Sequence, residues 1–163
     1  GAMCGGYAAG QFAASAALKK NTPLVCLESV ELEEERARIL RPLHSNGDTT
    51  HEPFESAIRQ VMSYYMGYVR NEKGMLQALD SLDRISRLTE DLRADNMHEL
   101  MRIHEAIDLL TMCRLATLCT LERKETSANT VYLRTDYPDP DPSLNKVLAV
   151  QKINGKPRVF WMD

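Results

Sequence analysis

Hydrophobic residues between positions 54 and 69 recur with the period of an α-helix. They fall at i, i+4, i+7, i+8, i+11 and i+15, which predicts a strongly amphipathic helix. Pro53 precedes them at a position that suits the first turn of a helix. The apolar residues of this stretch are Phe54, Ile58, Val61, Met62, Tyr65 and Val69.

Two more helical stretches follow after Arg70-Asn71 and after Asp95. In the first, leucines from Leu76 to Leu92 alternate with charged residues. The second, from about Asn96 to Arg123, is apolar nearly all round in its second half, which predicts the central and most buried helix. Short connections favour antiparallel neighbours. Residues 52–125 are therefore predicted to form a three-helix up-down-up bundle, in a chain of mainly α class.

The residues before the bundle form two segments of different character. Residues 4–20 are rich in Gly and Ala and predict a helix whose small side chains allow close approach to a neighbouring backbone. Residues 21–51 begin with the helix breaker Asn21-Thr22-Pro23 and continue as an acidic helix from about Glu28 to Leu40. The turn-forming residues from Pro42 to Thr50 then predict a flexible linker.

The C-terminal segment, residues 126–163, changes character again. The run from Asp136 to Pro142 alternates Asp with Pro and can be neither a helix nor a central strand. Two strand-like runs, Lys146 to Gln151 and Pro157 to Met162, flank Asn154-Gly155, a strong signal for a two-residue hairpin turn. We therefore predict a Pro-rich tail that ends in a β-hairpin.

Composition limits the possible functions. A net charge of −3 and a pI near 5.8 give no basic footprint for nucleic acid. No apolar run is long enough to span a membrane and no signal peptide is found, which favours a cytoplasmic protein. The four cysteines include no CxxC pair, so we expect reduced thiols rather than a zinc site, with a disulfide as the less favoured alternative. Residues 1–3, Gly-Ala-Met, resemble the scar of a cleaved expression tag.

An ordered set of short motifs resembles a known family. It comprises Asn71-Glu72-Lys73-Gly74-Met75-Leu76, Asn96 to Arg102, Leu121 to Thr126, and Tyr132-Leu133-Arg134-Thr135-Asp136-Tyr137-Pro138. This succession is similar to the C-terminal region of the fumarate reductase/succinate dehydrogenase flavoprotein superfamily, and within it to α-subunits of the adenylylsulfate reductase type. The opening helix, residues 4–20, resembles the last helix of the FAD-binding domain in that family.

The resemblance implies that the chain is part of an FAD-dependent oxidoreductase subunit. In such proteins the FAD-binding and substrate-binding groups lie upstream, and an iron–sulfur subunit is a frequent partner. We therefore expect no catalytic, cofactor-binding or metal-binding residue in this fragment, and a contact with the upstream FAD-binding domain of the same chain. The family commonly has an Arg after the Glu-Ser/Thr pair that closes the third helix. Here Ser127 follows Glu125-Thr126, so the contacts of that Arg are not expected.

Three residues are the candidate structural or docking residues: Glu125, Arg134 and Asp136. Arg134 follows the end of the most buried helix, and we expect it to pair with Glu125 or Asp136 and to fix the tail onto the bundle. The alternative is that Arg134 faces the catalytic domain or a partner subunit. Aromatic side chains of the tail, Tyr132, Phe160 and Trp161, are expected to pack the hairpin on the bundle.

Metal sites are disfavoured on geometric grounds. His98 and His104 are six residues apart and lie on different helix faces. The prolines between Asp136, Asp139 and Asp141 prevent the tight wrapping of a calcium loop.

Three functions compete at this stage. The first is a structural and docking domain of a flavoenzyme subunit, which we favour. The second is a free-standing helical interaction module that uses the acidic helix. The third is an independent enzyme, for which no acid/base or nucleophile set is found. The substrate of the parent enzyme, its electron carrier and the oligomeric state are not determined by the sequence.

Overall fold

The computed structural model describes residues 2–19, 29–127 and 130–162, with side chains from residues 5 and 30 onward in the first two ranges. The chain divides into two compact units, residues 1–38 and 39–163. The first unit holds α1 (Ala2–Lys19) and most of α2 (Ser29–Leu40). Ion pairs between Glu33 and Arg36 and between Glu35 and Arg38 support α2 from within.

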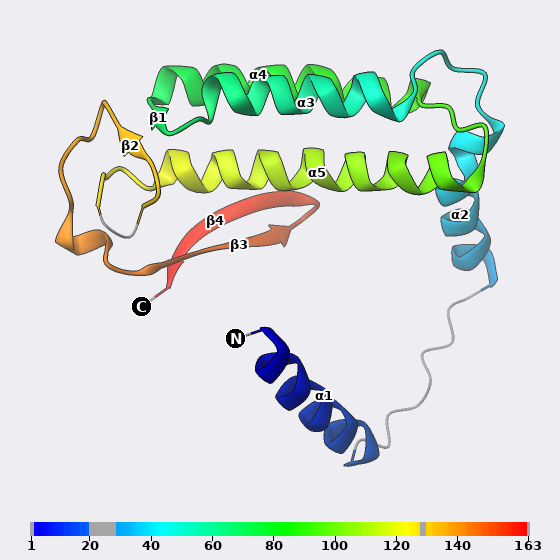
Figure 1. Ribbon diagram of the computed structural model, residues 1–163, viewed down its shortest axis with the longest axis horizontal. Helices are drawn as coiled ribbons and strands as arrows, with labels where there is room; N and C mark the ends of the chain where they lie inside the picture. The colour runs from blue at the N-terminus through cyan, green and yellow to red at the C-terminus, as the bar shows by residue number, and fades with distance from the viewer. Residues whose placement is uncertain (1, 20–28, 128–129, 163) are drawn as a thin grey trace. The chain divides into compact units, whose positions relative to one another are not determined.

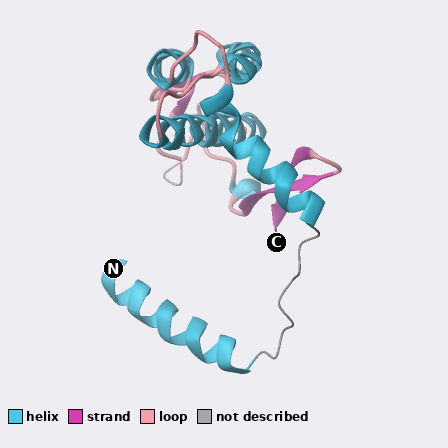
Figure 2. Cartoon of the chain, turned by 90° about the vertical axis from the view of Figure 1, so that its right-hand side faces the viewer, coloured by secondary structure: helices cyan, strands magenta, loops and turns pink. Residues whose placement is uncertain are grey.

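The second unit is built on a bundle of three helices, shown in Figure 1. These are α3 (His51–Tyr65), α4 (Glu72–Ser86) and α5 (Met97–Glu122), all in mutual contact. Figure 2 views the bundle along its helices. The prediction of a mainly α chain with a three-helix bundle is confirmed, and the observed helix limits lie within a few residues of the predicted ones.

Side-chain caps fix where α4 and α5 begin. The carboxamide oxygen of Asn71 accepts a hydrogen bond from the backbone N–H of Gly74 at 2.8 Å, and that of Asn96 accepts one from Glu99 at 3.0 Å. The Glu99 carboxylate returns the contact by accepting from the backbone N–H of Asp95 at 2.9 Å. These bonds satisfy free backbone donors at both helix N-termini, and at α5 they are reciprocal.

The hydrophobic core lies on the faces that the three helices turn toward one another. A smaller cluster of Met66, Met75 and Ala78 extends it at one end. The main cluster consists of Phe54, Ile58, Leu82, Ile85, Leu92, Ala94, Leu100, Ile103, Ala106 and Leu110.

Helix α5 is less buried than its sequence predicts. Its core residues occupy one face, while Met101 and Met112 on another face are 49% and 62% exposed. The hairpin covers a further part of its second half. The apolar residues of α5 therefore pack on the bundle at one face and on the hairpin at another. The helix is not enclosed on all sides.

The segment predicted as a flexible linker packs against the turn between α4 and α5. It begins with a 3₁₀ turn, η1 (Arg41–His44), in which Pro42 is buried and accepts a hydrogen bond from the N–H of Ala94 at 2.9 Å. Thr49 then forms an isolated parallel bridge with Leu92. On the other side of this contact, the turn between α4 and α5 contains a second 3₁₀ turn, η2 (Arg87–Asp91). Backbone hydrogen bonds thus hold a segment whose composition suggests a loop.

The C-terminal segment contributes strands to two small sheets. Strand β1 (Val69–Arg70) pairs in parallel with β2 (Leu133–Arg134) and brings the tail beside the turn between α3 and α4. A 3₁₀ turn, η3 (Pro142–Leu144), precedes the hairpin. The hairpin of β3 (Val147–Ile153) and β4 (Lys156–Met162) turns at Asn154 and Gly155, both with positive φ, as the sequence predicts. The β1–β2 ladder is too short to predict from the sequence.

Substitution of Gly47 by Ala should destabilise the second unit. A Cβ at Gly47 would lie 1.9 Å from the carbonyl oxygen of Asp91, so the packed loop must move. We expect a loss of about 1–3 kcal/mol in the free energy of unfolding, measured by denaturant titration. Gly10→Ala in α1, where a Cβ meets nothing within 4 Å, is the control and should cause no loss. Equal stability of Gly47→Ala and the parent chain would contradict the prediction.

Candidate functional site

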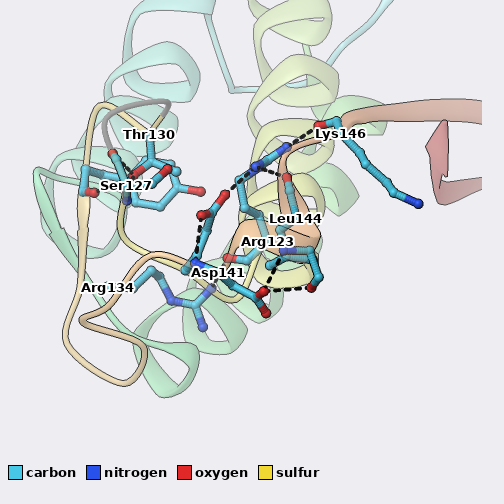
Figure 3. A network of polar contacts seen from close by, with 10 residues as sticks. Arg123, Ser127, Thr130, Arg134, Asp141, Leu144 and Lys146 are labelled. Atoms are coloured by element: carbon cyan, nitrogen blue, oxygen red, sulfur yellow. Dashed lines mark hydrogen bonds and ion pairs between the residues drawn. The ribbon is translucent and has the colours of Figure 1, made fainter. Parts of the chain in front are cut away.

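Arg134 lies at the centre of a polar network at the C-terminal end of α5, part of which Figure 3 shows. Its side chain comes from β2 and is fully buried, at 0% exposure. The Nε and Nη2 groups donate to the two carboxylate oxygens of Asp136, each at 2.8 Å. This two-point geometry is the strongest arrangement available to an arginine and a carboxylate.

The other terminal nitrogen of Arg134 caps α5. Nη1 donates to the carbonyl oxygens of Thr120 at 2.7 Å and Arg123 at 3.0 Å. Carbonyls in the last turn of a helix lack partners within the helix and carry its negative dipole end, so a buried cation is favoured there. The guanidinium therefore joins the tail to the bundle through both charge and hydrogen bonds.

Asp136 extends the network to a second helix. Its Oδ2 atom also accepts a hydrogen bond from the backbone N–H of Glu72, at the start of α4, at 2.8 Å. The hydrogen bonds from Arg134, aided by that from Glu72, lower the pKa of Asp136 from 3.8 to about 2 against the opposing effect of burial. Asp136 in turn raises the pKa of Arg134. One ion pair thus links the end of α5 to the beginning of α4.

Glu125 belongs to a neighbouring pair rather than to Arg134. It is 2% exposed and accepts from Nη1 of Arg123 at 2.5 Å and from the backbone N–H of Asp141 at 3.3 Å. Of the two partners expected for Arg134, the structure therefore has Asp136. The proposed docking role of Glu125, Arg134 and Asp136 stays a prediction.

Arg123 holds the hairpin, a role that the sequence interpretation missed. Its guanidinium donates to the carbonyl oxygens of Leu144 at 3.0 Å and Lys146 at 2.7 Å. It also lies 4.8 Å from the centre of the Trp161 ring, whose N–H contacts Glu122. The sequence did contain a signal for this role: an arginine stands at the end of an apolar helix, with an acidic residue two positions later.

Arg70 and Tyr132 close the other side of the network. The guanidinium carbon of Arg70 lies 4.3 Å from the centre of the Tyr132 ring, and its Nε donates to the carbonyl oxygen of Gly67 at 2.6 Å. Burial lowers the pKa of Arg70 and raises that of Tyr132. Tyr132 thus packs on the β1–β2 side, whereas Trp161 packs on Arg123.

Ser127 closes a local turn. Its backbone N–H donates to the hydroxyl of Thr130 at 3.1 Å, and that hydroxyl donates to the carbonyl oxygen of Ser127 at 3.0 Å. Ser127, where the family resemblance led us to expect an Arg, therefore takes part in a turn. Ala128 and Asn129, next to it, lie outside the described residues.

Residues considered for metal binding have other contacts. His104 lies with Nε2 at 2.9 Å from the carbonyl oxygen of Ile39. The carboxylate of Asp141 accepts from the backbone N–H of Ser143 at 2.9 Å, as a turn residue does. Within residues 2–19, 29–127 and 130–162 no group of three His, Cys, Asp or Glu could hold a metal ion.

The described residues contain no glycine-rich loop between a strand and a helix N-terminus. Dinucleotides are held by a glycine-rich loop between a strand and a helix N-terminus. Here Gly5, Gly6 and Gly10 lie inside α1, and the only parallel ladder among the described residues has two residues in each strand. We therefore derive no chemical step that involves a flavin from these residues.

Cys113 and Cys119 are free, partly buried thiols, as predicted. Burial raises the pKa of both, which keeps them protonated and unreactive at neutral pH. The side chain of Cys4 and the whole of Cys26 lie outside the described residues. No helix among the described residues is long and apolar enough to cross a membrane.

A family model described as the C-terminal domain of the fumarate reductase flavoprotein matches residues 55–161. The chain belongs to this family. The match covers α3 to β4, including every residue of the Arg134 network, and confirms the resemblance found in the sequence.

The chain is similar to a curated protein in sequence and to solved structures in fold. An uncharacterized FAD-dependent oxidoreductase of Methanocaldococcus jannaschii is 29% identical over 112 residues, which are 68% of this chain and 20% of the relative. Adenylylsulfate reductase from Archaeoglobus fulgidus has the same fold with a TM-score of 0.81 and 22% identity, over 91% of this chain and 27% of that one.

A quinol-fumarate reductase with menaquinol molecules is a further structural neighbour, with a TM-score of 0.70 and 17% identity, over 91% of this chain and 27% of that one. At these identities the structural neighbours establish the fold alone. The chain spans about a fifth of the curated relative and about a quarter of the chains in these solved structures.

Replacement of Arg134 by Met should strongly destabilise the domain. The change leaves Asp136 and two helix-terminal carbonyls without their buried cation, so we expect a loss of about 3–5 kcal/mol in the free energy of unfolding. Arg84→Met, which breaks the exposed pair with Asp80, is the matched control and should cost less than about 1 kcal/mol. Chemical denaturation measures both. Similar losses for the two variants would refute the central role of Arg134.

Acid should weaken the domain through Asp136. Its pKa is lower in the folded chain than the ordinary value of 3.8, so the folded state gains stability above that value and loses it as pH falls through about 2. The contribution is about 2 kcal/mol at neutral pH and disappears between about pH 5 and pH 1. Asp136→Asn should remove this component of the pH dependence. The measurement is the free energy of unfolding against pH, and an unchanged acid slope would disprove the assignment.

Proposed function

We propose that this chain is the C-terminal helical domain of an FAD-dependent oxidoreductase subunit, with a structural and subunit-docking role. The family match and the FAD-dependent relative support the flavoprotein assignment. Groups that bind FAD and substrate would then lie in the rest of the parent protein, and the domain would contact the FAD-binding domain of the same chain.

The burial of Arg134 is the observation that supports a structural role most directly. An arginine that binds substrate must present free N–H groups to a cavity, whereas Arg134 is 0% exposed and uses its donors on Asp136 and on helix carbonyls. Arg134, the candidate structural or docking residue of the sequence, is thus engaged in contacts within the domain.

An iron–sulfur subunit is the proposed partner of the parent protein, and the cytoplasm its proposed location. The proposal of an iron–sulfur partner follows from the family resemblance. The exposed apolar residues on α5, Met97, Met101 and Met112, offer a surface that a domain or subunit of the parent assembly would cover.

Flavin content tests the proposal. We expect a full-length parent chain to show flavin absorbance after purification, and the 163-residue chain to show none after incubation with FAD and gel filtration. Flavin in neither protein would favour a free-standing interaction module. Tight FAD binding by the 163-residue chain would show that the cofactor site lies within it, and would overturn the proposal.

The structural role has its own test in the full-length protein. Arg134→Met should lower the thermal midpoint while the folded enzyme, assayed well below that midpoint, keeps its flavin and its rate of flavin reduction by an artificial donor. Arg84→Met again serves as the control. A variant that keeps its thermal stability but loses flavin reduction would assign Arg134 to catalysis instead.

A further inference from the structure

The charge of the C-terminal hairpin differs in sign from that of the chain. Between residues 146 and 162 the sequence contains Lys146, Lys152, Lys156 and Arg158 and no acidic residue, whereas the whole chain has a net charge of −3. An edge hairpin gains protection from aggregation from a single lysine. A uniformly basic hairpin in an acidic chain calls for a further explanation.

The tip of the hairpin forms a cleft with the middle of α5. The cleft has a volume of about 450 Å³, a size typical of binding sites. Three of its lining residues come from the helix and five from the hairpin, so it exists only because the hairpin packs on the helix. They are Thr111, Arg114 and Leu115 of α5 and Val150, Lys152, Gly155, Lys156 and Pro157 of the hairpin.

The two lysines of the cleft are in different positions on the hairpin. Lys152 is the cross-strand partner of Pro157 and shares a strand face with Val150, which also lines the cleft. Lys156 follows the turn directly and is exposed. Neither ammonium group forms an ion pair with a carboxylate among the described residues.

The third cation of the cleft is already paired. Nη2 of Arg114 lies 2.7 Å from a carboxylate oxygen of Asp83 on α4. The pair neutralises much of the charge of Arg114 but leaves the two lysines uncompensated. The cleft therefore combines an apolar part, called its floor and lined by the partly buried Leu115 and Val150 and the exposed Pro157, with the free positive charges of two exposed lysines.

We propose that this cleft, the hairpin cleft, docks an acidic peptide segment of a partner protein, with one large apolar side chain on the floor and carboxylates against Lys152 and Lys156. Charge complementarity selects an acidic partner. The apolar floor selects a peptide with a hydrophobic anchor over a simple polyanion. The two lysines stand on the exposed rim, where a chain lying across the surface presents its carboxylates. The proposal does not depend on the flavin.

Fluorescence anisotropy with the 163-residue chain tests the proposal. The probe is a fluorescein-labelled peptide in which glutamates flank a single leucine. We expect saturable binding that weakens as salt is raised, because exposed charges are screened. Replacement of the leucine by serine should weaken binding about tenfold, as the loss of one buried apolar side chain does.

Charge variants locate the site. The double variant Lys152→Glu with Lys156→Glu should weaken binding at least about tenfold. The double variant Lys152→Gln with Lys156→Gln, which removes the charges without reversing them, should weaken binding less. Circular dichroism of both double variants shows whether they fold. The matched control, Lys73→Glu with Lys124→Glu, makes the same charge change at two exposed lysines of the second unit that do not line the cleft, and should alter affinity less than about twofold.

Several outcomes would overturn the proposal. One is the absence of saturable binding to the parent chain, and another is equal weakening by the hairpin and control variants. A third is equal affinity for the serine peptide or for a single-stranded oligonucleotide, which would leave only non-specific attraction between opposite charges. A dimer in gel filtration that the hairpin variants dissociate would assign the cleft to a second copy of the chain instead.

Discussion

The second unit depends on a buried arginine that binds one carboxylate and two carbonyl oxygens at the end of a helix. Arg134 binds Asp136 at two points and caps the last carbonyls of α5, while Asp136 receives a backbone donor from the start of α4. An ion pair removed from water costs several kcal/mol per charge unless its remaining donors and acceptors are satisfied. Here the helix termini satisfy them, because a helix C-terminus favours a cation and a helix N-terminus favours an anion.

This arrangement explains how an irregular tail is held in a fixed place. Residues 137–141, which follow Asp136, form neither helix nor strand, and their two prolines have no backbone donor to offer. The tail is attached instead through side chains at its two ends, by Arg134 at the first and by Arg123 at the second, where it holds the carbonyls of Leu144 and Lys146. The hairpin then has a defined position on α5, which is the condition for the hairpin cleft to exist.

The interior of the domain agrees with the structural role proposed for it. At the C-terminal end of α5, Arg134 pairs with Asp136 and Arg123 with Glu125, and the two described thiols are partly buried with raised pKa values. What remains available for interaction is the surface: the exposed methionines of α5 and the basic hairpin. Both are features that a partner could contact without a change in the interior.

The sequence by itself determined the three helices of the bundle, the hairpin and the family, but not the β1–β2 ladder or the 3₁₀ turns. Helical periodicity, the capping residues Asn71 and Asn96, and Asn154-Gly155 are local signals, and each predicts its element because the physics acts within a few residues. The ordered motifs likewise indicated the flavoprotein family. The tertiary structure decided what depends on distant parts of the chain: that Arg134 pairs with Asp136 while Glu125 pairs with Arg123, that α5 keeps an exposed methionine face, and that the loop before α3 is packed. An ion pair between equally suitable partners is chosen by the positions of the helix ends, and those positions exist only once the bundle has formed.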